Sequence, residues 1–426
     1  MHSALQDAYA ALPQQLLVQA LKHLHVQDRL KCALVCTAWR EAASQATTDI
    51  SISCKSGGPK KCAALTSWLL HHGTAAAVES ITVAADDYTM TGAYSHPLVL
   101  PLQHLPALRK LDAHMFAVAA VPSSDAAAAA AQASTQGSPR FAASVFLLPV
   151  ELSALTHLGL TYSFMQLTAL PTFTNLQRLE LDESVYSPGN PFTYGSNASN
   201  VAALQHALPQ LQQLTGLRLG YRYTSDAVMG TLRYLSRLQD LQLISSICTE
   251  AAFAAGALPN SLTCLKFDGI LGSNDRTLSP SSTPGFAQLT ALQSLSVGSV
   301  RVFDAALVQP LTALTHLYVL NCYTPPTGMA VLSGLQQLRC LVLSSRALPS
   351  VEPGSALDVG ALTASSHLTQ LGIGLGLVQH DQYIHLFPPG TVCAAIAKEY
   401  CGSKLLPLTL THASPVLNMH TSFVAI

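Results

Sequence analysis

A leucine phrase of the form LxxLxxLxL recurs along most of this chain and limits what it can fold into. Clear copies are LSALTHLGL at 152–160, LQQLTGLRL at 211–219 and LTALTHLYV at 311–319. The third apolar residue of nine copies falls at 158, 179, 217, 241, 265, 295, 317, 341 and 371, so most intervals lie between 21 and 30 residues. The LxL step places two leucines on one side of a short strand. Because one coil cannot bury its leucines alone, this period predicts a stack of coils.

The array resembles the leucine-rich repeat family across roughly residues 48–415. This resemblance implies an α/β solenoid with a curved parallel sheet and a convex side of irregular segments or short helices. The chain departs from the regular subtypes three residues after the last strand leucine, where asparagine or cysteine usually caps the turn. Cys322 fits that pattern, and Ser163, Ser184 and Ser246 can substitute for the usual residue. The family's asparagine ladder is therefore missing.

Segments of different composition interrupt the array and define the expected boundaries. The Ala-rich stretch 121–140 is of low complexity, and the Pro/Gly-rich stretch 184–200 is expected to form a loop extruded from one coil. Further short strands are expected at 50–52, 81–83 and 408–410. The predicted organisation is a helical module at 1–47, irregular first repeats at 48–120, the insert at 121–140, the main array at 141–415 and a tail at 416–426.

Composition argues against several functional classes. Charged residues make up 11% of the chain and hydrophobic residues 49%, which predicts a large buried core. The formal net charge of −1 provides no basic field, so neither nucleic acid nor a membrane is expected as a partner. No apolar run approaches the roughly 20 residues that a bilayer requires. The first ten residues do not resemble a secretory signal, and the ten cysteines include no C-x-x-C. We therefore expect a cytoplasmic or nuclear protein with free thiols.

Two helices are predicted ahead of the first strand, within residues 12–44. The first begins near Pro13 and carries a wide apolar face, while Asp28 is a suitable N-cap for the second. On a helical wheel, Cys32 and Cys36 extend the apolar face of the second helix beside Trp39. Metal binding by the two thiols with His23 and His25 is the alternative. Buried structural cysteines are the preferred interpretation, because no paired ligand spacing is present.

This segment resembles an F-box. The resemblance rests on Leu12-Pro13, Leu16-Leu17, Leu21, Leu24, Asp28, Leu30, Ala33-Leu34-Val35-Cys36 and Trp39-Arg40, with a departure at Ala20, where a β-branched residue is usual. It implies docking onto the small adaptor subunit of cullin–RING ubiquitin ligases. The implied adaptor-binding residues are Leu12, Pro13, Leu16, Leu17, Leu21, Leu30, Val35 and Trp39. The alternative is that the helices only cap the open end of the solenoid.

The residues between the strand leucines are expected to form a ladder on the concave face, where solenoids bind partners. Charged and aromatic side chains concentrate there, although Glu180 and Arg218 can instead simply pair with each other across adjacent strands. The predicted surface for a protein substrate comprises Arg178, Glu180, Asp182, Arg218, Tyr221, Gln242, Lys266, Asp268, His316 and Tyr318.

No enzyme signature is present in the sequence. P-loop, dinucleotide-binding, G-x-S-x-G and H-E-x-x-H motifs are all missing, and His157 and His316 simply occupy the same repeat position. We therefore expect no catalytic residue, metal or cofactor. The preferred hypothesis is a substrate-recognition subunit of an SCF-type ubiquitin ligase, and the alternative is a stand-alone leucine-rich repeat scaffold that binds proteins.

Overall fold

The computed structural model describes the following parts of the chain: residues 13–24, 26–53, 65, 67–69, 78–84, 98–100, 105–114, 118–120, 152–161, 167–182, 197–246, 248, 250–270, 277–281, 283–320, 322, 324, 331–344, 367–374, 392–397 and 406–410. The chain divides into two compact units, residues 1–214 and 215–426. In the described part, no helix is long and apolar enough to cross a membrane.

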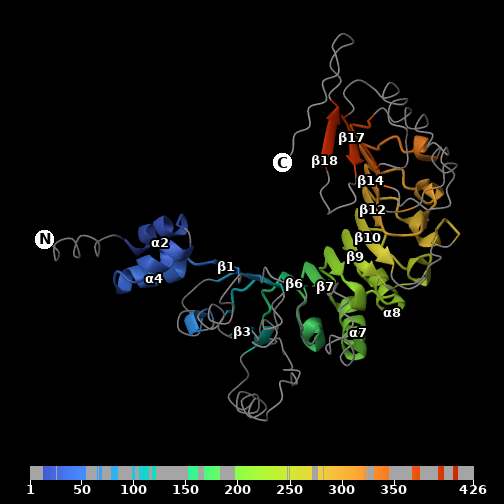
Figure 1. Ribbon diagram of the computed structural model, residues 1–426. Helices are drawn as coiled ribbons and strands as arrows, with labels where there is room; N and C mark the ends of the chain where they lie inside the picture. Colours follow the sequence, from blue (N-terminus) through green and yellow to red (C-terminus); the bar gives the residue numbers. More distant parts are fainter. Residues whose placement is uncertain are drawn as a thin grey trace, which may run out of the picture. The chain divides into compact units, whose positions relative to one another are not determined.

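Three short helices open the first unit: α2 (Gln14–Lys22), α3 (Val26–Cys32) and α4 (Thr37–Ala46) (Figure 1). The prediction of one helix from Asp28 through Trp39 was therefore wrong. Asp28 lies inside the first turn of α3, residues 33–35 form a turn, and the extended residue Cys36 is the N-cap of α4. A wheel drawn through that break places side chains on a common face that the chain does not have.

Parallel strands follow in both units. In the first unit the order is β1 (Asp49–Ser53), β2 (Ser80–Ala84), β4 (Lys110–His114), β6 (His157–Thr161) and β7 (Arg178–Asp182), with β3 (Leu98–Leu100) and β5 (Val118–Ala120) paired separately. In the second unit the order is β8 (Gly216–Leu219), β9 (Asp240–Ser246), β10 (Cys264–Ile270), β12 (Ser294–Gly298), β14 (His316–Leu320), β15 (Cys340–Ser344), β16 (Gln370–Gly374), β17 (Val392–Ala397) and β18 (Leu406–Leu410). Of these, β18 is antiparallel to β17.

Short helices connect the strands. Those of the first unit are η3 (Leu167–Thr172), α7 (Asn197–Ala207) and η5 (Leu208–Gln210). Those of the second are η6 (Tyr221–Tyr223), α8 (Asp226–Met229), η7 (Leu232–Tyr234), η8 (Glu250–Phe253), η9 (Pro284–Gln288) and η10 (Ala305–Val308), together with the small pair β11 (Thr277–Leu278) and β13 (Val302–Phe303). This is the predicted α/β solenoid, with a parallel sheet on one side and short helices on the other.

The repeated leucines form the core and shape the turn before each strand. In each LxxL step the second leucine N–H donates to the carbonyl of the first, as from Leu238 to Leu235 at 3.0 Å. Both leucines and the two strand leucines that follow them, such as Leu241 and Leu243, are essentially buried. Burying a leucine side chain contributes about 1.5–3 kcal/mol, so the stack of coils is held mainly by these residues.

A second ladder joins successive coils through the residue directly before ten of the described strands. Its carbonyl accepts two backbone N–H groups from the next coil at 2.7–3.0 Å, as Gln239 accepts from Thr263 and Cys264. The accepting residues are Thr48, Glu79, Arg109 and Thr156 in the first unit, and Thr215, Gln239, Thr263, Gln293, Thr315 and Arg339 in the second. Four of these carbonyls also accept a hydrogen bond from a threonine hydroxyl. The donating residues are Thr156, Thr263, Thr315 and Thr369.

Several sequence predictions can be compared with these elements. The strands expected at 50–52, 81–83 and 408–410 are present as parts of β1, β2 and β18. The turn position Cys322 is buried, and its thiol donates to the Leu320 carbonyl at 3.2 Å. Ser163, Ser184, the insert 121–140, most of the loop 184–200 and the tail 416–426 lie outside the described residues.

The threonine contribution to the ladder can be tested with Thr263→Val. This change keeps the branched shape but removes the hydroxyl that lies 3.2 Å from the Gln239 carbonyl, so we expect the free energy of unfolding to fall by about 1 kcal/mol. Thr312→Val, at an exposed turn residue, is the matched control and is expected to change it by less than about 0.5 kcal/mol. Urea denaturation measures both, and equal effects would contradict the assigned bond.

Candidate functional site

The N-terminal helices have a small core of their own. Leu17 and Leu21 of α2 pack with Ala42, Ala43 and Ala46 of α4, all buried. Arg29 of α3 reinforces this arrangement, because its Nε donates to the Leu24 carbonyl and its Nη1 to the Ala46 carbonyl at 2.7 Å. Val18, Cys32, Ala33 and Trp39 pack partly buried against this core, so the helices are fixed against one another without Leu16, Leu34 and Val35.

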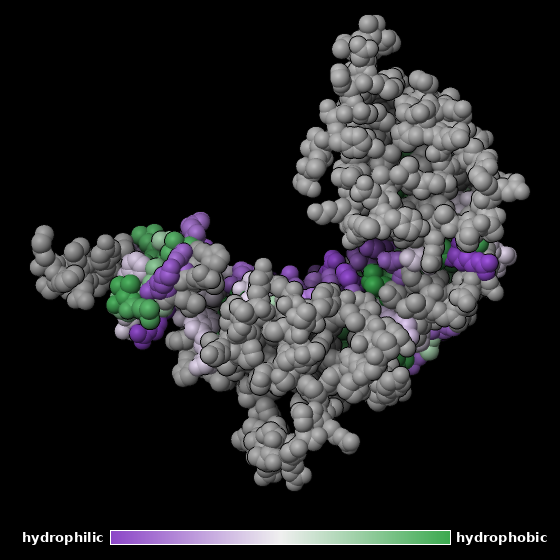
Figure 2. All heavy atoms as spheres, in the orientation of Figure 1, coloured by the Kyte–Doolittle hydropathy of each residue, from purple (hydrophilic) through white to green (hydrophobic). Residues whose placement is uncertain are grey.

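Large apolar side chains of the same helices remain exposed. Leu16 on α2 is 60% exposed, and Leu34 and Val35 in the turn between α3 and α4 are 81% and 60% exposed. Figure 2 shows hydrophobic surface over this helical region. Isolated exposed leucines are ordinary, but four of the five exposed large apolar residues of the described chain lie in these helices and the turns beside them, namely Leu16, Leu24, Leu34 and Val35. This distribution indicates a surface for a partner.

The predicted adaptor-binding residues divide into three groups. Pro13, Leu16 and Val35 are exposed and available, whereas Leu17 and Leu21 belong to the helical core and Trp39 is half-buried against it. Leu12 and the side chain of Leu30 lie outside the described part. Leu24 and Leu34 are also exposed but were not among the predicted adaptor-binding residues. For Leu34, the assumed continuous helix hid the turn that exposes the side chain.

The cysteines of this segment are not both buried. Cys32 is half-buried against the helical core, while Cys36, the N-cap of α4, is exposed, so its interpretation as a buried filler was wrong. Within the described residues, no group of three or more His, Cys, Asp or Glu side chains is arranged to hold a metal ion.

On the sheet of the first unit, two rows of charged residues run across the strands. Lys110, His157 and Arg178 are register partners on β4, β6 and β7. Two residues further along, Asp112 and Glu180 occupy the next row, with Gly159 between them. In Figure 2 hydrophilic residues gather over β6 and β7.

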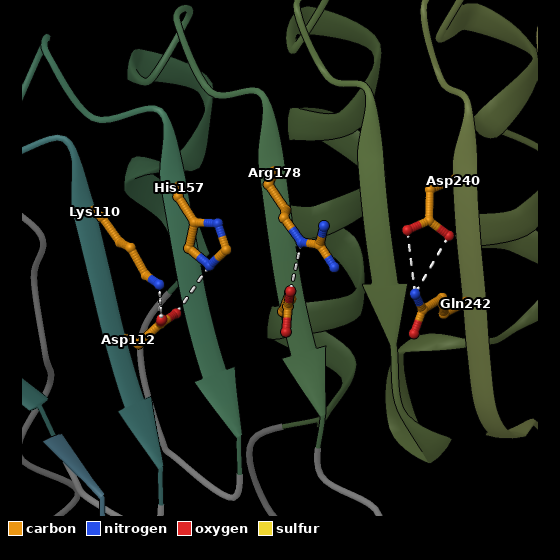
Figure 3. Close-up of polar contacts among 7 residues, drawn as sticks. Lys110, Asp112, His157, Arg178, Asp240 and Gln242 are labelled. Carbon is orange, nitrogen blue, oxygen red and sulfur yellow. Dashed lines mark hydrogen bonds and ion pairs between the residues drawn. The ribbon is translucent and has the colours of Figure 1, made fainter. Parts of the chain in front are cut away.

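Each base contacts an acid of the neighbouring row (Figure 3). Asp112 Oδ1 lies 2.9 Å from His157 Nε2, and its Oδ2 lies 3.0 Å from Lys110 Nζ. Arg178 Nε donates to Glu180 Oε1 at 2.6 Å along the same strand. Burial alone would raise the pKa of Asp112, but hydrogen bonds and charge from His157 and Lys110 outweigh it and lower that pKa. Asp112 is therefore a carboxylate at neutral pH, and His157 Nε2 is the donor.

Gly159 is required by this arrangement. The Asp112 carboxylate lies directly over it, and a Cβ at residue 159 would collide with Asp112 Oδ1. The charged residues line a hollow of about 520 Å³ together with Thr82, Ala113, His114 and Thr161. Arg178 and Glu180 thus lie where the sequence placed them. Asp182 does not, because it is only 2% exposed and contributes no accessible surface.

The predicted residues of the second unit form their own row. Arg218, Gln242, Lys266, Ser296 and Tyr318 are successive register partners on β8, β9, β10, β12 and β14, which confirms the predicted ladder over these strands. Two acids beside this row have neutral hydrogen-bond donors. Gln242 donates to Asp240 (Figure 3), and the Ser299 hydroxyl donates to Asp268 at 3.2 Å.

The aromatic end of this row is constrained by its neighbours. The His316 and Tyr318 rings stack with centroids 6.5 Å apart. The Cys340 thiol lies 3.5 Å from the Tyr318 hydroxyl, and this contact, with burial, raises the pKa of Tyr318 to about 12. Tyr318 is therefore neutral at physiological pH. Tyr221 is half-buried in η6 at the end of β8.

Sequence reasoning missed Asp112 and assigned no role to His157. The copy LPALRKLDA contains Asp112 at the same position as Glu180, between the two inward strand residues, so extending the ladder one strand toward the N-terminus would have identified it. The contact between Asp112 and His157 is not visible in the sequence, because 45 residues separate the two.

Gly159→Ala tests whether the charged rows depend on the missing side chain. The new methyl group must displace the Asp112 carboxylate from His157 and Lys110, so we expect unfolding to become easier by about 1–2 kcal/mol. At Gly334 a Cβ would meet nothing within 4 Å, and Gly334→Ala is expected to have little effect. Chemical denaturation compares the two variants, and a neutral Gly159→Ala would contradict this arrangement.

The lowered pKa of Asp112 predicts a pH-dependent stability. Because its folded pKa lies below the unfolded value of about 3.9, the carboxylate stabilises the fold above that value and loses its effect as the pH falls through the folded pKa. We expect Asp112→Asn to be less stable than the wild type at pH 7, with the difference shrinking as the pH falls below the unfolded value of about 3.9. Urea midpoints from pH 2.5 to pH 7 measure this. A difference independent of pH would not come from the carboxylate charge.

Comparison with known proteins shows that one segment of the chain matches a protein family. Residues 9–48 match the F-box-like family. Among curated proteins, none matches the chain significantly. Similar solved structures include the internalin InlF of Listeria monocytogenes, with 14% identity, 88% of this chain and 90% of that chain covered and a TM-score of 0.44. The functional domain of InlJ from the same organism has 14% identity, coverage of 84% and 59% and a TM-score of 0.40.

These structural likenesses are too distant to carry an argument, and the repeat assignment rests on the strands, buried leucines and coil-to-coil bonds of the chain itself. The chain thus carries an F-box-like segment followed by a leucine-rich repeat solenoid, a combination with a role in protein interaction.

Proposed function

We propose that this chain is the substrate-recognition subunit of an SCF-type cullin–RING ubiquitin ligase. Its N-terminal helices would dock the small adaptor subunit, and the outward face of the strands would bind a protein target. The observation that carries the proposal is the exposure of Leu16, Leu34 and Val35 on an F-box-like segment whose own core is already complete.

The energetics of these side chains support a docking role. Leu16, Leu34 and Val35 contribute little to the helical core, so their exposure to water costs free energy that only a partner recovers. Hot-spot residues cost about 2 kcal/mol or more when truncated, and they fill well-packed, desolvated pockets near the centre of an interface. Leu16, Leu34 and Val35 would fill such pockets on the adaptor.

The proposed receptor performs no chemistry itself. It would hold a target close to a ubiquitin-charged enzyme recruited through the adaptor, and proximity of this kind raises the rate of an otherwise bimolecular transfer. The charged rows on β4, β6 and β7 and the row from Arg218 to Tyr318 would contact the target. A cytoplasmic or nuclear location is part of the proposal.

A stand-alone scaffold is the second candidate. In that case the helices only cap the array, and the position of α4, which ends at Ala46 shortly before β1 begins at Asp49, is consistent with such a role. A cap needs no outward leucines, however, so the two candidates differ in what Leu16 and Leu34 do.

The double variant Leu16→Asp, Leu34→Asp separates the two functions. Both side chains are exposed, so we expect the fold to be retained, while binding of purified adaptor falls by at least about a hundredfold because two charges would be buried in an apolar interface. Surface plasmon resonance with immobilised adaptor measures the affinity, and circular dichroism checks the fold.

Tyr234→Asp is the matched control, since Tyr234 is an exposed large apolar residue (47%) in the second unit. It is expected to leave adaptor binding unchanged. If the wild-type chain does not bind the adaptor, or if the double variant binds as tightly as the wild type, the ligase function is wrong and the scaffold remains.

A further inference from the structure

Arg29 connects all three N-terminal helices through one side chain. It lies within α3, where its Nε donates to the Leu24 carbonyl at 2.9 Å and its Nη1 donates to the Ala46 carbonyl at 2.7 Å. Leu24 lies in the bend after α2, and Ala46 is the last residue of α4. Carbonyls at the C-terminal end of a helix lack partners within that helix and carry partial negative charge. A guanidinium group therefore suits both places.

The exposed turn after α3 is bonded to that helix. Ala33 donates its backbone N–H to the Arg29 carbonyl at 3.0 Å, and Leu34 and Val35 donate theirs to carbonyls in the last turn of α3 at 3.1 Å. These bonds continue the helical pattern of α3 into residues 33–35. The helix and the turn therefore move as one piece, and whatever fixes α3 also fixes the turn.

The position of α3 sets the spacing of the side chains proposed for docking. Leu16 lies on α2, whereas Leu34 and Val35 follow α3, so the distance between them depends on how α3 is held against α2. The buried core of the module consists of α2 and α4 side chains, and the described side chains that α3 adds are only partly buried. If the guanidinium bonds are removed, the packing of α2 on α4 is retained, but α3 and its turn can shift.

We propose that Arg29 is a positioning residue for adaptor docking. By holding α3 to the ends of α2 and α4, it keeps Leu34 and Val35 at the distance from Leu16 that the adaptor recognises. Arg29 acts through these side chains rather than by touching the adaptor, because its Nε and Nη1 are engaged by carbonyls of its own chain. This inference rests on the proposed receptor function.

Adaptor binding by the full chain tests the proposal with Arg29→Met. Methionine keeps much of the length of the side chain but removes the donors to the Leu24 and Ala46 carbonyls. We expect the affinity for purified adaptor, measured by surface plasmon resonance, to fall about tenfold.

A double-mutant cycle with Leu34→Ala distinguishes positioning from a loss of stability. If Arg29 sets the position of Leu34, truncating Leu34 costs at least about threefold less affinity in the Arg29→Met background than in the wild type, because the side chain no longer meets its pocket. A smaller folded fraction would instead reduce both affinities by the same factor and leave the effect of Leu34→Ala unchanged.

Lys31→Met is the matched control. Lys31 is a neighbouring cation on α3, but its ammonium lies 2.8 Å from Asp28 of the same helix, so its loss leaves the bonds of Arg29 between helices intact. We expect this variant to change the affinity less than about twofold at physiological salt. An equal loss in Lys31→Met and Arg29→Met would assign the effect to charge and overturn the inference.

The fold of the module is followed through Trp39, which packs against its core. Because the chain has two tryptophans, fluorescence is read in a Trp68→Phe background. If Arg29→Met unfolds the module, Arg29→Lys takes its place in the cycle, since one ammonium cannot reproduce the fork that serves two carbonyls. If neither variant keeps the module folded, Arg29 is a residue of the fold and the inference is wrong.

The same measurements separate this inference from the receptor function. A wild-type chain that binds the adaptor, together with unchanged affinity in Arg29→Met or additive effects of Arg29→Met and Leu34→Ala, overturns only the role of Arg29. A wild-type chain that does not bind the adaptor overturns both. Reduced affinity in a folded Arg29→Met, with a smaller effect of Leu34→Ala, supports the inference.

Discussion

The carbonyl directly before each of ten strands is the contact on which the rest of the solenoid depends. It accepts two N–H groups of the next coil, and in four coils a threonine hydroxyl as well. Buried backbone groups must be paired, so a one-residue shift between coils would leave several donors without acceptors. The ladder therefore fixes the register that the leucines alone, which recur at similar spacing on every coil, would define less sharply.

Fixed register is what turns scattered side chains into a site. Lys110, His157 and Arg178 are far apart in the sequence but share one register position. The ion pairs to Asp112 and Glu180 then form because the register places the basic row beside the acidic row. Gly159 completes the arrangement, because any side chain there would displace the Asp112 carboxylate. Exposed ion pairs contribute little to stability. The less exposed pairs of Asp112 contribute more, and they also position charges over an open surface.

The sequence predicted the solenoid and much of the ladder because both follow from a local period. Leucine spacing identifies the strand positions, and alternation then assigns Gln242, Lys266 and Tyr318 to the outward face, where the structure has them. Contacts between coils were not predictable in this way. Asp182 continues the alternation as an outward residue but is buried, and the threonine hydroxyl bonds depend on how closely neighbouring coils approach. The prediction of the second N-terminal helix was wrong for another reason. A helical wheel assumes one continuous helix, but the chain turns at residues 33–35.

The turn at residues 33–35 changes which side chains are exposed on the N-terminal helices. Placing Leu34 and Val35 between two helices removes them from any helical face and points them away from the core that Leu17, Leu21 and the α4 alanines complete. Folding of the module does not require these two side chains, because both are exposed and lie outside its core. The leucines that form the core and the leucines proposed for docking are thus separate sets within the same module. Substitutions can therefore separate the stability of the module from its proposed docking.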